Sequence, residues 1–165
     1  MASEYRAEID RILTRELGAG SRIPLSSIPN TRDLGGYAGA GNRCVKRHRL
    51  IRSGALSSLN EEDIRMLTEE YGLNTVVDFR TKAEAQEKPD THMEGVTYIS
   101  LPVLREAQLG MTHEEDPNRK ISLMELVQNE STNAGQFMQK IYEALIHDEY
   151  ALGQYREFFR IMRAN

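Results

Sequence analysis

The stretch NTVVDFRTKAE, residues 74–84, decides the fold class. Its first part, TVVDF (75–79), is rich in β-branched residues, which is typical of a strand buried in a sheet. Its second part contains Thr81 followed by Glu84, the capping-box pattern that begins a short helix, and Pro89 ends that helix. The stretch therefore predicts a strand that leads directly into a helix.

The neighbouring segments continue this alternation of strands and helices. A second strand, VTYISL (96–101), is predicted to end at Pro102. Before the first strand, Asn60 can cap a helix that has acids in its first turn and stops at Gly72. Strands alternating with helices of about ten residues predict an α/β layer structure in which a mostly parallel sheet is flanked by helices.

The ends of the chain are predicted to add three helices, two loops and one further strand region. We expect a helix over 3–17, a loop rich in Pro, Ser, Asn and Gly over Arg22–Asn42 and one or two short strands within 44–52. A polar lid or loop is expected over Arg105–Lys120, followed by amphipathic helices over 134–147 and 150–163. Three or four strands are few for a finished sheet of this class. We therefore expect one domain over residues 1–165 that is incomplete at its C-terminal side.

Composition excludes several classes of protein. The 165 residues are 39% hydrophobic, which is typical of a globular domain. Their formal charge of −4 argues against generic binding to nucleic acid. No apolar run approaches the ~20 residues of a membrane span, and the N-terminus lacks the pattern of a secretory signal. A single cysteine excludes an intramolecular disulfide and a multi-cysteine zinc site. We expect a cytoplasmic protein; secretion by the organism stays open.

The single cysteine, Cys44, does not fit a phosphate-transferring nucleophile. Such a cysteine needs an arginine six residues later to hold the phosphate oxygens, and that position is Leu50. Motifs of the type G-x-S-x-G, H-E-x-x-H and G-x-x-x-x-G-K-[ST] are also missing from the 165 residues. We expect Cys44 to be a buried or half-buried thiol on a strand.

Four fragments, in order, carry a family resemblance: PNTRDLGGY (29–37), VKRHRLIRSGALSSL (45–59), LTEEYGLNTVVDFRTKAE (67–84) and YISLPV (98–103). This series resembles the N-terminal half of the bacterial tyrosine-phosphatase-like family, from Ile23 to about Val103, and the likeness is looser from 104 to 165. The resemblance implies a partial cysteine-phosphatase-like fold. It implies a metal-independent enzyme, with no cofactor, that acts on phosphotyrosine, phosphoserine, phosphothreonine or phosphoinositides.

The family's catalytic loop, H-C-x-x-G-K-D-R-T-G, does not occur in this sequence. In the family that loop follows the helix pair that corresponds to 134–163. The resemblance therefore predicts the N-terminal part of a phosphatase, inactive by itself, that lacks the phosphate-loop strand and the helices after it. Some family members carry a general-acid Asp after the strand that ends in Pro, and Glu106 is the candidate for that role here.

Five residues match the family's motifs and are the candidates for the border of the phosphate site: Asn30, Arg32, Asp33, Asp78 and Arg80. Asp78 and Arg80 come at the carboxyl end of the 75–79 strand, the edge at which open α/β sheets bind ligands. The alternative is that Arg32–Asp33 and Asp78–Arg80 are two structural ion pairs that fix loops.

Two functions of other classes stay open beside the truncated phosphatase. One is a pseudo-phosphatase module that binds phosphorylated partners without turnover, and the other is a structural or oligomerisation module. If the sheet is incomplete, the apolar faces of the last two helices are uncovered, which predicts a homodimer or poor stability. The residues of these faces are Phe137, Ile141, Tyr155, Phe158 and Phe159.

Overall fold

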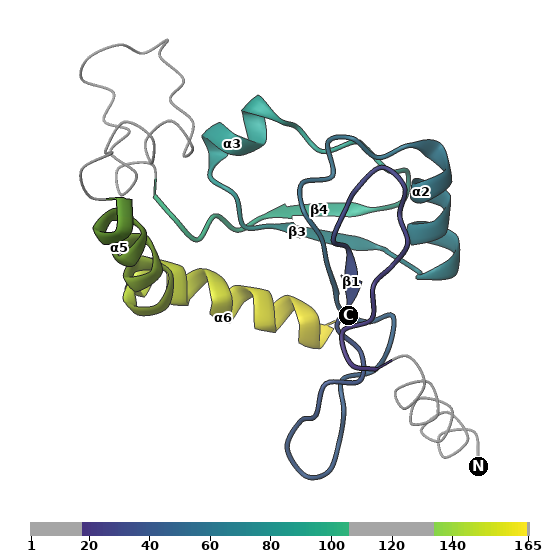
Figure 1. Cartoon of the computed structure of the whole chain (residues 1–165), viewed down its shortest axis with the longest axis horizontal. Helices are drawn as coiled ribbons and strands as arrows, with labels where there is room; N and C mark the ends of the chain where they lie inside the picture. The colour runs from purple at the N-terminus through teal and green to yellow at the C-terminus, as the bar shows by residue number, and fades with distance from the viewer. Residues whose placement is uncertain (1–17, 106–133, 165) are drawn as a thin grey trace. The chain divides into compact units, whose positions relative to one another are not determined.

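The computed structural model of the chain describes residues 18–105 and 134–164 (Figure 1). Its elements are the strands β1 (Arg32–Asp33), β2 (Ile51–Arg52), β3 (Thr75–Asp78) and β4 (Thr97–Ser100), and the helices α2 (Glu61–Arg65), η1 (Met66–Glu70), α3 (Lys82–Glu87), α5 (Ala134–His147) and α6 (Glu149–Ala164). The predicted mixed α/β class is confirmed. The predicted helix over 3–17 and nearly all of the predicted loop over 105–120 lie outside the described residues.

Contacts divide the chain into two compact units. Unit 1 is Met1–Asn74 with Asp90–Glu94, and unit 2 is Thr75–Pro89 with Gly95–Asn165. Unit 1 holds an antiparallel pair of strands, β1 and β2, and unit 2 holds a parallel pair, β3 and β4.

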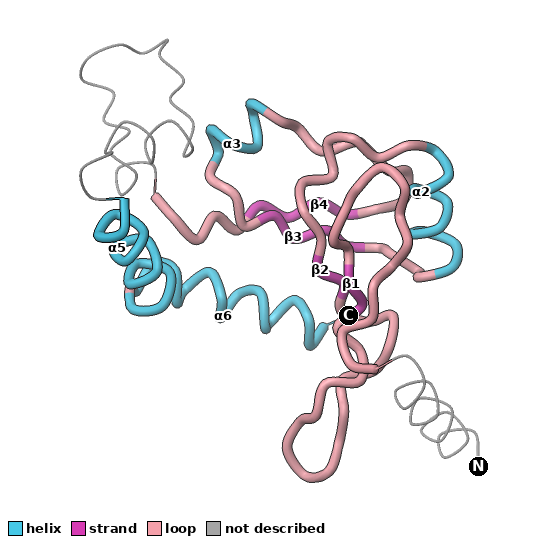
Figure 2. The backbone as a smooth tube through the Cα atoms, viewed as in Figure 1, coloured by secondary structure: helices cyan, strands magenta, loops and turns pink. Residues whose placement is uncertain are grey.

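Unit 1 is mostly loop, as the tube in Figure 2 shows, yet the segment predicted as a loop over Arg22–Asn42 contains β1. Arg22 also pairs with Arg32 in an antiparallel bridge. The sequence gives no alternating pattern here because β1 is only two residues long and its outward residue is charged. The buried apolar side chains of the unit are Ile23, Leu25, Ile28, Leu56, Leu59, Leu67 and Met93.

The helix predicted after Asn60 is confirmed. The side chain of Asn60 accepts a hydrogen bond of 2.8 Å from the Asp63 amide, and three acids occupy the first turn of α2. The chain continues from α2 into η1, a π-helical segment. Gly72, with a φ of 66°, follows and ends the helical run in the left-handed region that glycine tolerates.

The expected burial of Cys44 is wrong, because its thiol is exposed. Cys44 pairs with Ala38 in an isolated bridge, and the Gly39 amide donates a 2.7 Å hydrogen bond to the Arg43 carbonyl. Residues 37–44 are all exposed, so none of the described segments covers the thiol.

Unit 2 begins with the strand–helix–strand segment that the sequence predicts. β3 and β4 lie side by side, with Val77 opposite Ile99 in the parallel register (Figure 1). At the start of α3, the Thr81 hydroxyl accepts from the Glu84 amide and the Glu84 carboxylate accepts from the Thr81 amide at 2.9 Å. Both hydrogen bonds of the predicted capping box are therefore present.

The two C-terminal helices form as predicted, but their apolar faces are less exposed than expected. The ring of Phe79, just after β3, packs at 5.2 Å from Phe158 and 6.0 Å from Tyr155. Ile141 is buried, whereas Phe159 is 57% exposed. The side chain of Phe137 lies outside the described residues. The expectation of uncovered faces is therefore wrong for Ile141 and only partly right for Tyr155 and Phe158, because α6 packs on the residue that follows β3.

Tyr142, Ile146 and Met162 add further exposed apolar side chains on these helices. In the part of the chain that the structure describes, no helix is both long and apolar enough to cross a membrane.

Candidate functional site

The carboxyl ends of β3 and β4 meet at one edge of unit 2. Asp78 lies opposite Ser100, and the pairing continues beyond both strands. The Leu101 amide donates to the Asp78 carbonyl at 2.8 Å, and the Val103 amide donates to the Phe79 carbonyl at 3.2 Å. Since these bonds hold the two outgoing segments together, the side chains that follow each strand are gathered at this edge.

Asp78 and Arg80 form a closely paired ion pair at that edge. The Arg80 Nη2 donates to Asp78 Oδ2 at 2.7 Å, and the Arg80 Nε donates to Asp78 Oδ1 at 2.9 Å. Asp78 Oδ1 also accepts the Arg80 amide at 2.9 Å. The remaining arm, Nη1, donates to the carbonyl of Lys88 at 2.8 Å. Arg80 thus ties the end of β3 to the last turn of α3, which is what the structural alternative predicts of this pair.

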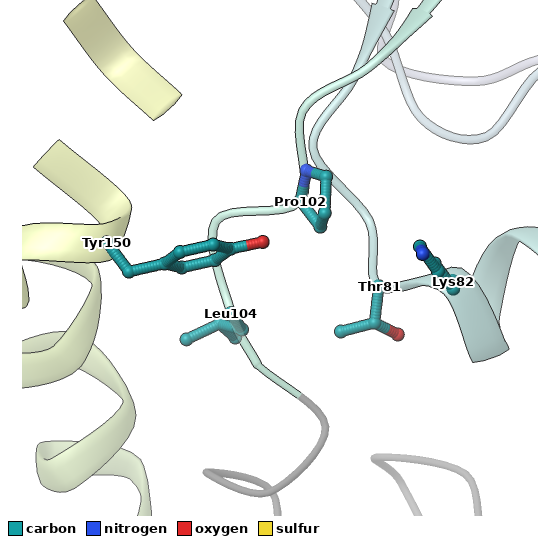
Figure 3. A pocket seen from close by; sticks show the side chains of 5 residues that line it. All are labelled: Thr81, Lys82, Pro102, Leu104 and Tyr150. Carbon is teal, nitrogen blue, oxygen red and sulfur yellow. The ribbon is translucent and has the colours of Figure 1, made fainter. Parts of the chain in front are cut away.

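An open pocket of about 140 Å³ lies in unit 2, where the chain leaves β3 and β4. It is lined by Thr81, Lys82, Pro102, Leu104 and Tyr150, which Figure 3 shows as sticks. Thr81 and Lys82 follow β3, Pro102 and Leu104 follow β4, and Tyr150 comes from α6. In Figure 3 the Tyr150 ring extends from α6 towards Pro102 and Leu104.

Two cations and one carboxylate lie at or next to the residues that line this pocket. Lys82 is exposed, and the guanidinium of Arg105 lies 4.6 Å from the centre of the Tyr150 ring, a cation–π contact. The carboxylate of Glu84 accepts hydrogen bonds from the Thr81 amide and hydroxyl, both at 2.9 Å. A pocket lined by a lysine and by a phenol ring on which an arginine stacks is chemically suited to an anionic group such as a phosphate monoester.

Sequence reasoning singled out Asp78 and Arg80, which form the ion pair, but not the residues that line the pocket. Lys82 could have been found, because it follows the Asp-x-Arg-Thr strand end directly. Tyr150 carried no such signal, because it is between 46 and 69 residues away along the chain from the other residues that line the pocket.

Asp33 is the buried residue among the unit 1 candidates for the phosphate site, and its carboxylate holds two segments of the chain together. Its Oδ1 accepts the Gly35 amide at 2.9 Å and its Oδ2 accepts the His48 amide at 3.2 Å. The Arg47 guanidinium lies 3.9 Å from the same carboxylate. Asp33 is only 2% exposed, so these contacts join the β1 turn to the segment before β2 from the inside.

Gly35 lies next to Asp33 and is required for close packing. A side-chain carbon built on Gly35 would come within 2.6 Å of the Arg47 Cα. At Gly36 the φ is 85°, which fits the turn expected at this position.

Asn30 and Arg32 lie on the exposed side of unit 1. The Arg32 Nε donates to Asn30 Oδ1 at 3.2 Å, and its Nη1 donates to the Gly20 carbonyl at 3.2 Å. The ion pair of Asp33 is formed with Arg47, so the alternative pairing of Arg32 with Asp33 is wrong. Neighbouring residues in a strand point to opposite faces, which is why Arg32 and Asp33 separate.

Asp63 is a further buried acid, which the sequence indicated only as part of an acidic helix start. Its carboxylate accepts the Ser27 amide at 2.7 Å, the Ser26 amide at 3.1 Å and the Ser27 hydroxyl. Burial alone would raise the pKa of Asp63, but the hydrogen bonds from Ser27 and Ser26 outweigh burial and lower the pKa below its ordinary value. This cluster fixes the loop before β1 to α2.

Among the residues that the structure describes, no three His, Cys, Asp or Glu side chains are grouped closely enough to hold a metal ion. The general-acid candidate Glu106 lies outside the described residues.

Comparison with known proteins supports a family for this chain. The model of the tyrosine phosphatase family matches residues 23–165. A Cupriavidus necator protein with the provisional name tyrosine-protein phosphatase is 38% identical over 82 residues, which are 50% of this chain and 30% of that protein. The chain therefore aligns with less than a third of this curated relative. Because the family match extends over most of the sequence, the chain belongs to the tyrosine phosphatase family.

Proposed function

We propose that this chain is the N-terminal part of a cysteine-dependent phosphatase that hydrolyses phosphate monoesters of phosphotyrosine and related phosphoresidues. The observation that carries the proposal is the family match over residues 23–165. In this proposal the nucleophile loop, H-C-x-x-G-K-D-R-T-G, belongs to polypeptide outside these 165 residues, and the chain alone is inactive.

The pocket of unit 2 supports a role in holding the substrate. Lys82 and Arg105 offer positive charge to a phosphorylated side chain, and the Tyr150 ring offers an apolar wall to its aromatic or aliphatic part. Asp78 and Arg80 border this pocket in the proposal, and Arg80 acts by fixing the strand end from which Thr81 and Lys82 follow.

Asn30, Arg32 and Asp33 are also proposed to border the phosphate site of the intact phosphatase, as the family's motif implies. Asp33 acts there as a positioning residue, because its carboxylate oxygens already accept hydrogen bonds from two backbone amides. A homodimer through the exposed apolar side chains of α5 and α6 is a second proposal about this chain, and it is tested below.

The experiment has two steps. First, the DNA beyond the codon of Asn165 is sequenced for an open frame that encodes H-C-x-x-G-K-D-R-T-G. Second, the 165-residue chain and the chain extended through that loop are assayed with para-nitrophenyl phosphate and a phosphotyrosine peptide. We expect activity only in the extended chain, and it should be lost when the loop cysteine is changed to Ser. A downstream sequence without the loop contradicts the proposal and favours the pseudo-phosphatase or structural module.

A further inference from the structure

Three arginines of unit 1 lie in a row across neighbouring strand segments. Arg22 is the bridge partner of Arg32, and Arg32 is the register partner of Arg52. Residues directly opposite each other in an antiparallel pair share one face of the sheet. All three arginines are exposed. Because neighbouring strands are ~4.8 Å apart, the three side chains leave the sheet along a line of about 10 Å. We call these residues the arginine row.

None of the described acids of unit 1 forms an ion pair with the row. Asp33, the next residue along β1, faces the interior, where its carboxylate is bound by backbone amides. Within the described residues no ion pair involves any member of the row. The segment 18–59, which holds the row, contains seven lysines and arginines and the single acid Asp33, a formal charge of +6, whereas the described residues of unit 1 as a whole, 18–74 and 90–94, balance at eight cations and eight acids.

Like charges directly opposite each other destabilise a sheet, so a row of three has a cost in the free protein. Part of the row is nevertheless held in place. Two hydrogen bonds, to the Asn30 side chain and the Gly20 carbonyl, orient the Arg32 guanidinium before any ligand arrives. Such pre-organisation lowers the entropy that binding must overcome. An anion bound along the row would also relieve the repulsion.

The geometry selects among anions. Each guanidinium presents a planar fork that matches the oxygens of a phosphate group. A single phosphate can reach one or two of these forks, whereas a chain of linked phosphates extends along the row. A membrane surface is less well matched. Among the described residues of unit 1, Tyr37 is the one exposed large apolar side chain, and three charges alone bind anionic lipid weakly.

We propose that the arginine row of Arg22, Arg32 and Arg52 is a binding site for a linear polyphosphate group. The group is either an inorganic polyphosphate or the phosphate chain of a nucleoside triphosphate. Arg32 is shared with the border of the phosphate site proposed above, whereas Arg22 and Arg52 are not, and binding along the row does not require the nucleophile loop.

The test uses the 165-residue chain and titrates it with inorganic tripolyphosphate, orthophosphate and ATP, without divalent cations, by isothermal calorimetry. The double variant R22Q/R52Q removes the two ends of the row. The matched control K46Q/R49Q also removes two exposed cations of unit 1, but outside the row. Circular dichroism and urea midpoints establish that both variants stay folded.

We expect tripolyphosphate to bind at least ten-fold more tightly than orthophosphate. R22Q/R52Q should weaken tripolyphosphate binding ten-fold or more, and K46Q/R49Q less than three-fold. Equal affinity for ATP and tripolyphosphate identifies the phosphate chain alone as the ligand, and tighter ATP binding identifies a nucleotide.

Three results would overturn the proposal. One is the same loss in both double variants, which indicates a response to net charge only. Another is equal binding of orthophosphate and tripolyphosphate. The third is binding to phosphatidylserine vesicles with no measurable binding of tripolyphosphate, which replaces the proposed ligand by a membrane. If R22Q/R52Q does not fold, the single variants R22Q and R52Q are compared with K46Q and R49Q, and equal losses in all four count against the row.

Discussion

The carboxylate of Asp78 holds the guanidinium of Arg80 from two residues away, while the other arm of Arg80 reaches the Lys88 carbonyl. One side chain thereby joins the end of β3 to the end of α3. Two of the residues that line the pocket, Thr81 and Lys82, lie on the segment between Asp78 and Lys88. The ion pair therefore sets where the pocket's polar side chains can be.

The first prediction concerns Arg80. In a chain extended through the nucleophile loop, Arg80→Ala should lower kcat/KM at least ~10-fold, which corresponds to ~1.4 kcal/mol of transition-state stabilisation. The reason is that the segment of Thr81 and Lys82 loses its anchor. Steady-state kinetics with a phosphotyrosine peptide measure this effect, and Arg163→Ala, at the exposed end of α6, is the control. Unchanged kinetics in a folded Arg80→Ala protein would favour a role in stability alone.

The second prediction concerns Asp63. Asp63→Asn should lower the free energy of unfolding by about 2 kcal/mol, because an amide cannot replace the charge-assisted hydrogen bonds from Ser26 and Ser27. Urea unfolding at neutral pH measures this loss. Glu62→Gln removes an exposed acid from the same turn of α2 and should change little.

The same residue predicts a pH dependence of stability. The pKa of Asp63 is lowered in the folded protein, so its contribution is present above the pKa of the unfolded chain, ~3.9. That contribution is lost as the pH falls through the lower, folded value. The urea midpoint of the wild-type chain should therefore fall more steeply below about pH 5 than that of Asp63→Asn. Parallel curves would mean that Asp63 does not set this dependence.

The third prediction concerns Cys44. Because the thiol is exposed, a thiol reagent should label the native chain about as fast as the urea-unfolded chain. Cys44→Ser should leave the hydrolysis of para-nitrophenyl phosphate at the buffer background, as in the unaltered chain. Hydrolysis above background that disappears in Cys44→Ser would assign Cys44 a catalytic role and contradict the proposed function.

The fourth prediction concerns the apolar side chains of α5 and α6. Ile146 is 61% exposed and Phe159 is 57% exposed, and burying a side chain of this size stabilises by ~1.5–3 kcal/mol. We expect the chain to self-associate at micromolar concentration in light scattering. Ile146→Lys with Phe159→Lys should return it to a monomer, whereas the exposed His147→Lys should not. A monodisperse wild-type monomer would exclude the homodimer.

Local patterns alone determined much of this protein. The β-branched run of β3, the Asn60 cap and the Thr81–Glu84 capping box depend on residues within a few positions of one another, so a reader of the sequence can recognise them. The Asp78–Arg80 pair is equally local, since its two residues are two positions apart and follow one strand.

Only the tertiary structure decided how distant residues combine. Asp33 is paired with Arg47 because alternation along β1 directs Asp33 inwards and Arg32 outwards. Tyr150 reaches the pocket because α6 packs beside the residues that follow β3 and β4. The arginine row exists because separate segments meet in register. Such pairings depend on which strands and helices come together, and no periodicity within a single segment encodes that choice.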